Sequence, residues 1–178
     1  EAVSYAWRDL EMKCVGFSEI EPFPCAVLRE RFPGVPNLGD ITKITQRQIE
    51  QLGRIDIVVG GWPCQDLSIA GARKGLTNAD GTHTRSGLFY QFAKIADWSK
   101  ARWVLGENVP GLFSSHGGRD FASVVGELAG AEFGVPADGW KNTGVALWPK
   151  GLVEWCVLDA QWRGLAQRRK RVFVVRDS

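Results

Sequence analysis

Short apolar segments typical of buried strands alternate along this chain with longer segments of helical periodicity. The clearest strand signal is IDIVV at residues 55–59, a largely β-branched run followed at once by two glycines. In segments such as residues 88–98, apolar side chains recur every three or four positions, as on one face of a helix. Strands and helices in repetition predict an α/β fold with a mainly parallel sheet.

The predicted elements cover most of the chain. Helices are expected at residues 2–10, 23–32, 46–52, 88–98 and 121–129. Strands are expected at residues 14–17, 55–59, 103–105, 153–158 and 172–175. The Gly- and Pro-rich stretch 130–151 is interpreted as a long connection, so a single domain is predicted over residues 1–178.

Composition excludes several classes of function. The formal net charge of +2 over 178 residues is too small to indicate a nucleic-acid partner by itself. The four cysteines form no CxxC pair and the two histidines stand alone, so no metal site is predicted. Cys14, Cys25 and Cys156 lie within apolar patterns and are interpreted as small buried hydrophobes. No run of 18 apolar residues appears, which predicts a cytoplasmic protein with reduced thiols and no membrane span.

The stretch GGWPCQDLS at residues 60–68 follows the strand signal directly. Two glycines permit a tight turn and Pro63 fixes its own φ, so Cys64 would be presented at the rim where α/β sheets carry their sites. A thiol ionises to the nucleophilic thiolate in such a polarised, accessible place, although a free cysteine is usually a small buried hydrophobe. The basic AGARKG behind it suits a mobile loop that contacts phosphates.

Acidic residues follow other expected strands. Glu19 follows the strand expected at residues 14–17, Asp40 comes a little later in the chain, and Glu107 follows the strand expected at residues 103–105. A single such residue is often a helix cap, but several at one rim of a sheet indicate a binding or catalytic site.

Together these motifs resemble those of the DNA (cytosine-5) methyltransferases. GGWPCQDLSIAGARKG is similar to the family's nucleophile motif, GENVPG at 106–111 to its glutamate motif, and QRRKR at 167–171 to its QxRxR motif. GFSE at 16–19 and GDIT at 39–42 resemble its cofactor-contacting segments, and SGLF at 86–89 resembles the segment after the mobile loop. The matches occur in the family's order and cover nearly the whole chain.

The resemblance implies a Rossmann-like, S-adenosylmethionine-dependent methyltransferase sheet with helices on both faces, here truncated. It implies that the Cys64 thiolate adds to C6 of a cytosine flipped out of double-stranded DNA, so that C5 can accept a methyl group. The implied catalytic residues are Cys64, Glu107, Arg169 and Arg171. The implied cofactor-binding residues are Glu19, Ile20, Asp40, Ile41, Pro63 and Leu88, with Glu19 on the ribose and Asp40 on the adenine amino group. The implied DNA-binding residues are Gln65, Ser68, Arg73, Lys74, Asn108 and Gln167.

Three departures from the family pattern shape the expectations. The family opens with a strand and an FxGxGG turn and continues beyond QxRxR into a target-recognition region, and this sequence shows neither; Ala166 also stands where proline is common. The chain is therefore interpreted as part of a catalytic domain of a bacterial or phage enzyme, monomeric at full length. Residues 1–178 alone are expected to bind S-adenosylmethionine poorly and to transfer no methyl groups.

Three alternatives remain open at the level of sequence. One is a catalytically inactive, DNA-binding remnant of the same family. Another is a relative that methylates transfer RNA, although such relatives usually carry an aromatic residue and Thr after PCQ, where this chain has Asp66-Leu67-Ser68. The third, a nicotinamide-dependent oxidoreductase, would need a GxGxxG turn after its first strand, which no predicted strand has.

Overall fold

The computed structural model describes residues 2–63 and 86–178. Contacts between Cα atoms divide the chain into two compact units, Glu1–Ile55 and Asp56–Ser178, and each unit is described by itself. The segment that contains Cys64, Gln65, Ser68, Arg73 and Lys74 lies outside the described residues.

The first unit is helical. It contains α1 (Ala2–Ala6), α2 (Pro22–Arg31), a 3-10 turn (Ile41–Lys43) and α3 (Gln46–Gln51). Helix α1 is shorter than predicted, whereas α2 and α3 agree with prediction to within one residue. Helix α3 begins with a capping box, in which the Thr45 hydroxyl accepts the N–H of Gln48 and the Gln48 side chain accepts the N–H of Thr45.

The predicted strand at residues 14–17 is wrong. Among the described residues this segment makes a single parallel bridge, between Phe17 and Asn37. The ladder stops there because the Asn37 side chain takes up the next backbone groups: its Oδ1 accepts the N–H of Glu19 at 3.0 Å and its Nδ2 donates to the Glu19 carbonyl at 3.0 Å. A side-chain amide therefore replaces the neighbouring strand.

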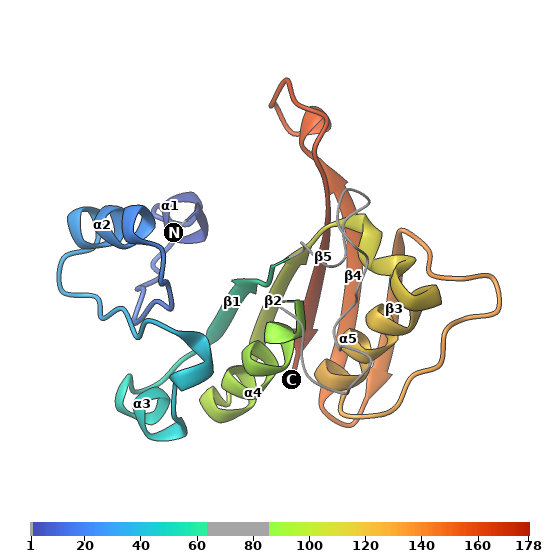
Figure 1. Ribbon diagram of the computed structural model, residues 1–178, viewed down its shortest axis with the longest axis horizontal. Helices are drawn as coiled ribbons and strands as arrows, with labels where there is room; N and C mark the ends of the chain where they lie inside the picture. The colour runs from blue at the N-terminus through green and yellow to red at the C-terminus, as the bar shows by residue number, and fades with distance from the viewer. Residues whose placement is uncertain (1, 64–85) are drawn as a thin grey trace. The chain divides into compact units, whose positions relative to one another are not determined.

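The second unit is built on a five-stranded sheet of order β1-β2-β5-β4-β3 (Figure 1). The strands are β1 (Ile57–Gly61), β2 (Trp103–Asn108), β3 (Thr143–Trp148), β4 (Gly151–Asp159) and β5 (Lys170–Asp177). The α/β class is confirmed, but the expectation of a mainly parallel sheet is wrong, since β1–β2 is parallel and the other three pairings are antiparallel. Strand β3 lies inside the predicted connection, and the two residues between it and β4 allow only a hairpin.

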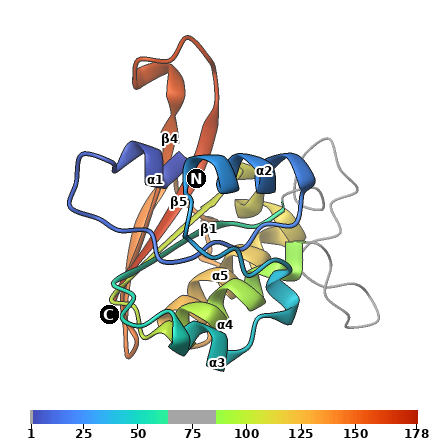
Figure 2. The ribbon, with the colours of Figure 1, turned by 90° about the vertical axis from the view of Figure 1, so that its left-hand side faces the viewer.

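Two helices, α4 (Phe89–Ser99) and α5 (Arg119–Ala129), lie on the same face of this sheet (Figures 1 and 2). Three short 3-10 segments, Ser86–Leu88, Pro110–Phe113 and Ser115–Gly118, lead into these helices, and a fourth, Ala160–Trp162, follows β4. Period-two alternation along β5 places Val172, Val174 and Arg176 on the helix-covered face, where all three are buried.

Helix α4 is tied to the sheet by a buried cation. Arg176 is 4% exposed, and its Nη1 donates to Asp97 Oδ1 at 3.0 Å, while its Nε has no hydrogen-bond partner. Lys150 Nζ donates to the other Asp97 oxygen at 2.8 Å from the solvent side. Asp97 is therefore the counter-charge that makes the burial of Arg176 tolerable.

We expect Asp97→Asn to lower the free energy of unfolding by about 3 kcal/mol, because it leaves a buried guanidinium without a counter-charge. Urea denaturation measures this loss. Lys150→Met is the matched control: it removes the exposed partner of the same carboxylate and should cost less than about 1 kcal/mol. Equal losses in the two variants would contradict the role given to the buried pair.

Candidate active site

The ends of four strand segments meet at one edge of the sheet. Strands β1 and β2 run in parallel, so Gly61 lies beside Glu107. Strand β5 runs the opposite way and begins where they end, with Phe173 beside Glu107 and Lys170 beside Asp159. Beyond this edge, β4 and β5 continue into an arm, residues 159–170, that stands clear of the sheet (Figures 1 and 2).

Two arginines hold one carboxylate oxygen at this edge. Arg171 Nε lies 2.7 Å from Glu107 Oε1, and Arg169 Nη2 lies 3.8 Å from the same atom. Arg169, just before β5, and Arg171, its second residue, are thus directed at the same carboxylate. The three side chains are 28% to 43% exposed, so they are oriented by one another and still accessible to a ligand.

A cavity of about 220 Å³ opens over this group. Besides Glu107, Arg169 and Arg171, it is lined by residues that the sequence analysis missed: Leu158, Ala160, Arg163 and Phe173. Phe173 could have been predicted from the sequence, because it lies two residues after Arg171 in the same strand and therefore points to the same face. Arg163 had no such signal, since it reaches the cavity only through the path of the arm that joins β4 to β5.

Asn108 has an internal role. It is 3% exposed, its Nδ2 donates to the Trp62 carbonyl at 3.3 Å, and its Oδ1 accepts the N–H of Val109 at 2.8 Å. The Asn108 amide is therefore engaged with backbone groups inside the fold, and its assignment to DNA stays a prediction. Consecutive strand residues point to opposite faces, so while Glu107 lines the cavity, Asn108 points into the core and joins the ends of β1 and β2.

The two glycines before Trp62 do not form the predicted turn; they are the last residues of β1. A Cβ at Gly61 would lie 3.1 Å from Glu107 Oε2. A Cβ at Gly106, on the neighbouring strand, would lie 3.0 Å from Trp62 Cζ3. Trp62 is 6% exposed and its ring packs 4.7 Å from that of Phe89, measured between centroids. Gly61 and Gly106 thus permit the close packing of β1, which leads to Cys64, against β2, which carries Glu107.

We expect Gly106→Ala to lower the free energy of unfolding by about 1–3 kcal/mol, the usual cost of overpacking, because the added methyl meets the buried Trp62 indole. Urea denaturation checks the value. Gly134→Ala is the control, since nothing lies within 4 Å of a Cβ there. A Gly106→Ala protein as stable as the control would show that Trp62 moves aside without cost.

In the first unit, Glu19 and Asp40 lie at the starts of helical turns. Glu19 Oε1 accepts the N–H groups of Ile20 at 2.8 Å and Glu21 at 2.9 Å, while Ile20 is 65% exposed. Asp40 Oδ1 accepts the hydroxyl and the N–H of Thr42, and these hydrogen bonds lower the pKa of Asp40. Ile41, the first residue of that turn, is half-buried.

Two positioning residues in this unit had no signal in the sequence. Asn37 brackets the backbone of Glu19, and the Cys25 thiol donates to the Glu19 carbonyl at 3.3 Å. Cys25 is half-buried, as are Cys14 and Cys156, so the expectation that these cysteines are buried hydrophobes holds only in part.

The other predicted residues are dispersed in the second unit. Pro63 is exposed at the end of the described segment, and Leu88 is half-buried before α4. Gln167 lies on the arm, where its N–H donates to the Leu165 carbonyl at 2.7 Å. None of these three lines the cavity over Glu107.

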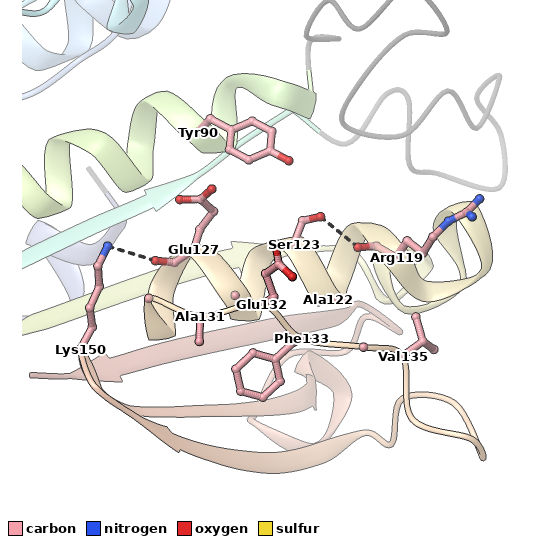
Figure 3. A pocket seen from close by; sticks show the side chains of 13 residues that line it. Tyr90, Arg119, Ala122, Ser123, Glu127, Ala131, Glu132, Phe133, Val135 and Lys150 are labelled. Atoms are coloured by element: carbon pink, nitrogen blue, oxygen red, sulfur yellow. Dashed lines mark hydrogen bonds between the residues drawn. The ribbon is translucent and has the colours of Figure 1, made fainter.

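A larger cavity, of about 830 Å³, runs along α5 between Tyr90 of α4 and residues 131–135 (Figure 3). Two of its polar side chains bond to neighbouring backbone: the Ser123 hydroxyl donates to the Arg119 carbonyl, and Lys150 Nζ donates to the Glu127 carbonyl. No predicted site residue lines it. The larger cavity is therefore distinct from the group of residues suited to chemistry.

Within residues 2–63 and 86–178, no three His, Cys, Asp or Glu side chains gather as metal ligands would. None of the described helices is long and apolar enough to cross a membrane.

Comparison with known proteins agrees with the predicted family. A family model described as C-5 cytosine-specific DNA methylase matches residues 1–176. A DNA N-6-adenine-methyltransferase of Escherichia phage P1 is 38% identical over 204 residues, which cover 98% of this chain and 27% of the relative. The type II methyltransferase M.NlaIV of Neisseria lactamica is 34% identical (94% of this chain, 35% of the relative), and M.MspI of Moraxella sp. is 32% identical (92% and 33%). The chain thus spans about a third or less of the length of these relatives.

Solved structures share the fold. The Schizosaccharomyces pombe Dnmt2 methyltransferase superposes with a TM-score of 0.63 at 14% identity, covering 98% of this chain and 47% of that one. A mutant of Spodoptera frugiperda DNMT2 gives a TM-score of 0.61 at 18% identity, covering 99% and 46%. At such identities the likeness concerns the fold alone.

Proposed function

This chain belongs to the C-5 cytosine-specific DNA methylase family, and we propose that it carries part of an enzyme that methylates C5 of cytosine in double-stranded DNA. The observation that carries the proposal is the carboxylate of Glu107, held by Arg169 and Arg171 in a cavity beside the end of β1. The motif that contains Cys64 follows β1 directly. Acid and cations therefore lie at the edge of the sheet where β1, the strand that precedes the Cys64 motif, ends.

Cytosine C5 is too weak a nucleophile to accept a methyl group unaided. We assign the Cys64 thiolate, whose role rests on the sequence, to attack C6 so that electron density moves to C5. Glu107 hydrogen-bonds the N3 edge and holds a proton there, which prevents negative charge from building up on the ring. After transfer, a water molecule takes up the C5 proton, the electron pair of that bond re-forms the C5–C6 double bond, and the bond from Cys64 to C6 breaks so that the thiolate is restored.

The two arginines act on the base and on Glu107. Each guanidinium offers several donors in a planar fork, which suits a pyrimidine carbonyl as well as a carboxylate. In the absence of a base, Arg171 and Arg169 are directed at Glu107 Oε1. A base that enters the cavity would meet donors already oriented by that ion pair, so little side-chain ordering remains to be done on binding.

S-adenosylmethionine would supply the methyl group from its sulfonium. The first unit offers residues that fit its nucleoside part: Glu19 keeps its second carboxylate oxygen outside the hydrogen bonds to Ile20 and Glu21, and Ile20 is exposed beside it. Carboxylates in this role bind ribose hydroxyls in other nucleotide-binding α/β proteins. We assign Glu19 to the ribose, Ile20 and Ile41 to the adenine faces, and Asp40 to the adenine amino group.

A cytosine within a duplex cannot reach the cavity, so the base must be flipped out of the stack, which costs a few kcal/mol. The arm beside the cavity carries the cations Arg163, Arg168 and Lys170 in addition to the two arginines on Glu107. Neutralising phosphates in this way is the main source of DNA affinity. A monomeric state for the full-length enzyme stays a prediction.

Other activities make different demands on these residues. The phage P1 relative is named for adenine N6, and an exocyclic amine can take a methyl group directly, without a thiol adduct. A binding remnant would keep DNA affinity without turnover, and a relative acting on transfer RNA would modify RNA. The test is to incubate DNA and RNA with the product of the full reading frame that encodes these residues and then to sequence both. The four outcomes are methylated cytosine in DNA, methylated adenine in DNA, methylated RNA, and binding without methylation.

We expect Cys64→Ser in that full-length protein to abolish methyl transfer and covalent trapping on DNA that contains 5-fluorocytosine, because the hydroxyl is not ionised as a thiol is. Denaturing gel electrophoresis detects the trapped complex. Cys156→Ser, a half-buried cysteine of β4, is the matched control and should trap as the wild type does. A Cys64→Ser protein that still traps DNA would remove Cys64 from the mechanism.

We expect Glu107→Gln to slow methyl transfer about 100-fold or more, the usual scale for loss of a general acid. Single-turnover kinetics with labelled cofactor measure the chemical step. Glu154→Gln changes an exposed glutamate on β4 and should leave the rate unchanged. Near-normal turnover by Glu107→Gln would reject the proposed proton transfer.

A further inference from the structure

The tip of the arm carries exposed apolar side chains among cations. Trp162 is 79% exposed and Leu165 is 53% exposed. Between residues 163 and 171 the chain has five basic residues and no acidic one: Arg163, Arg168, Arg169, Lys170 and Arg171. Exposing a tryptophan in this way forfeits the apolar burial that its ring would otherwise gain, which is a common mark of a binding surface.

The tip is nevertheless held in place. Asp159 Oδ1 accepts the N–H groups of Gln161 at 3.2 Å and Arg169 at 3.1 Å, and Oδ2 accepts the Gln161 side chain at 2.7 Å. Burial raises the pKa of Asp159, but these hydrogen bonds outweigh it and the pKa is lowered. The Ala160 carbonyl also accepts the N–H groups of Arg163 and Leu165. Because its loop is tied at both ends, Trp162 is presented on an ordered support.

The position of the tip indicates what it contacts. Arg163 lines the cavity over Glu107, while the preceding residue, Trp162, is outside that lining. Trp162 therefore lies within one residue of the cavity lining without belonging to it. The five cations favour a polyanion over an apolar protein surface. When one base leaves a duplex, the adjacent bases lose a stacking partner, and a flat indole can replace it.

We propose that Trp162 stacks on a base adjacent to the flipped nucleotide, with Leu165 as its apolar neighbour, and so stabilises the opened duplex. This role deepens the proposed function and rests on it for the identity of the nucleotide in the cavity. Trp162 is then a DNA-positioning residue: it acts on the duplex, while Glu107 and the two arginines act on the target base.

The test is equilibrium binding by the full-length protein. The probe is a fluorescein-labelled DNA duplex with one cytosine opposite an abasic position, titrated at several salt concentrations. We expect Trp162→Ala to bind about tenfold more weakly, within the range for loss of one base–aromatic stack. The dependence of affinity on salt should be unchanged, because no phosphate contact is lost. Trp162→Phe, which keeps a stacking ring, should recover most of the affinity.

Two control variants separate stacking from other effects. Trp148→Ala removes an exposed tryptophan at the opposite end of the β3–β4 hairpin and should bind as the wild type does. Arg168→Gln removes one cation of the tip and should reduce the salt dependence by about one phosphate contact. The urea midpoint of Trp162→Ala should match the wild type, since the side chain is 79% exposed.

Wild-type affinity in Trp162→Ala would overturn the inference, as would a loss of affinity that Trp162→Phe does not recover. A reduced salt dependence in Trp162→Ala would also overturn it, by showing that the residue acts through phosphates. The binding comparison does not use methyl transfer as its readout. A protein that binds the probe through Trp162 but forms no 5-methylcytosine would reject the proposed function and retain the stacking contact.

Discussion

The antiparallel pairing of β5 with β2 is the constraint on which the site depends. Its register sets Phe173 beside Glu107, so Arg171, two residues earlier, reaches Glu107 Oε1 at 2.7 Å. The same register sets Arg176 beside Val104 on the helix-covered face, where Asp97 of α4 pairs with it. One strand thus supplies cations to both faces of the sheet, the first for chemistry and the second for anchoring a helix.

The alternation of strand side chains keeps those two tasks apart. Glu107 faces the cavity, whereas its neighbours Gly106 and Asn108 face the core and contact Trp62. A substitution that shifts Trp62 would therefore shift the backbone of β2 at Glu107 and the end of β1, although Trp62 lies on the opposite face from the Glu107 side chain. The glycines of β1 and β2 permit the close packing that this coupling needs, since a Cβ at Gly61 would lie 3.1 Å from the Glu107 carboxylate.

The two units divide the work of the proposed reaction. In the first, hydrogen bonds from the backbone and from Thr42 fix the carboxylates of Glu19 and Asp40. In the second, guanidinium groups fix the carboxylate of Glu107. Backbone N–H groups leave a carboxylate available to neutral hydroxyl and amino groups of a nucleoside, whereas guanidinium groups also offer donors to a base and its phosphates. The kind of support given to each acid thus matches the ligand proposed for it.

The sequence by itself determined the family, the α/β class, and the presence of Glu107, Arg169 and Arg171 on one site, because spaced motifs and period-two alternation are local properties of the chain. Tertiary structure decided what depends on partners distant in the sequence. The Asn37 side chain ended the expected strand at residues 14–17, three antiparallel pairings replaced the expected parallel ones, and the Trp62 carbonyl engaged the Asn108 amide in the core. Arg163 lines the cavity and Trp162 does not because of the path of the arm that joins β4 to β5, and the path of a loop in space leaves no periodic signal in the sequence.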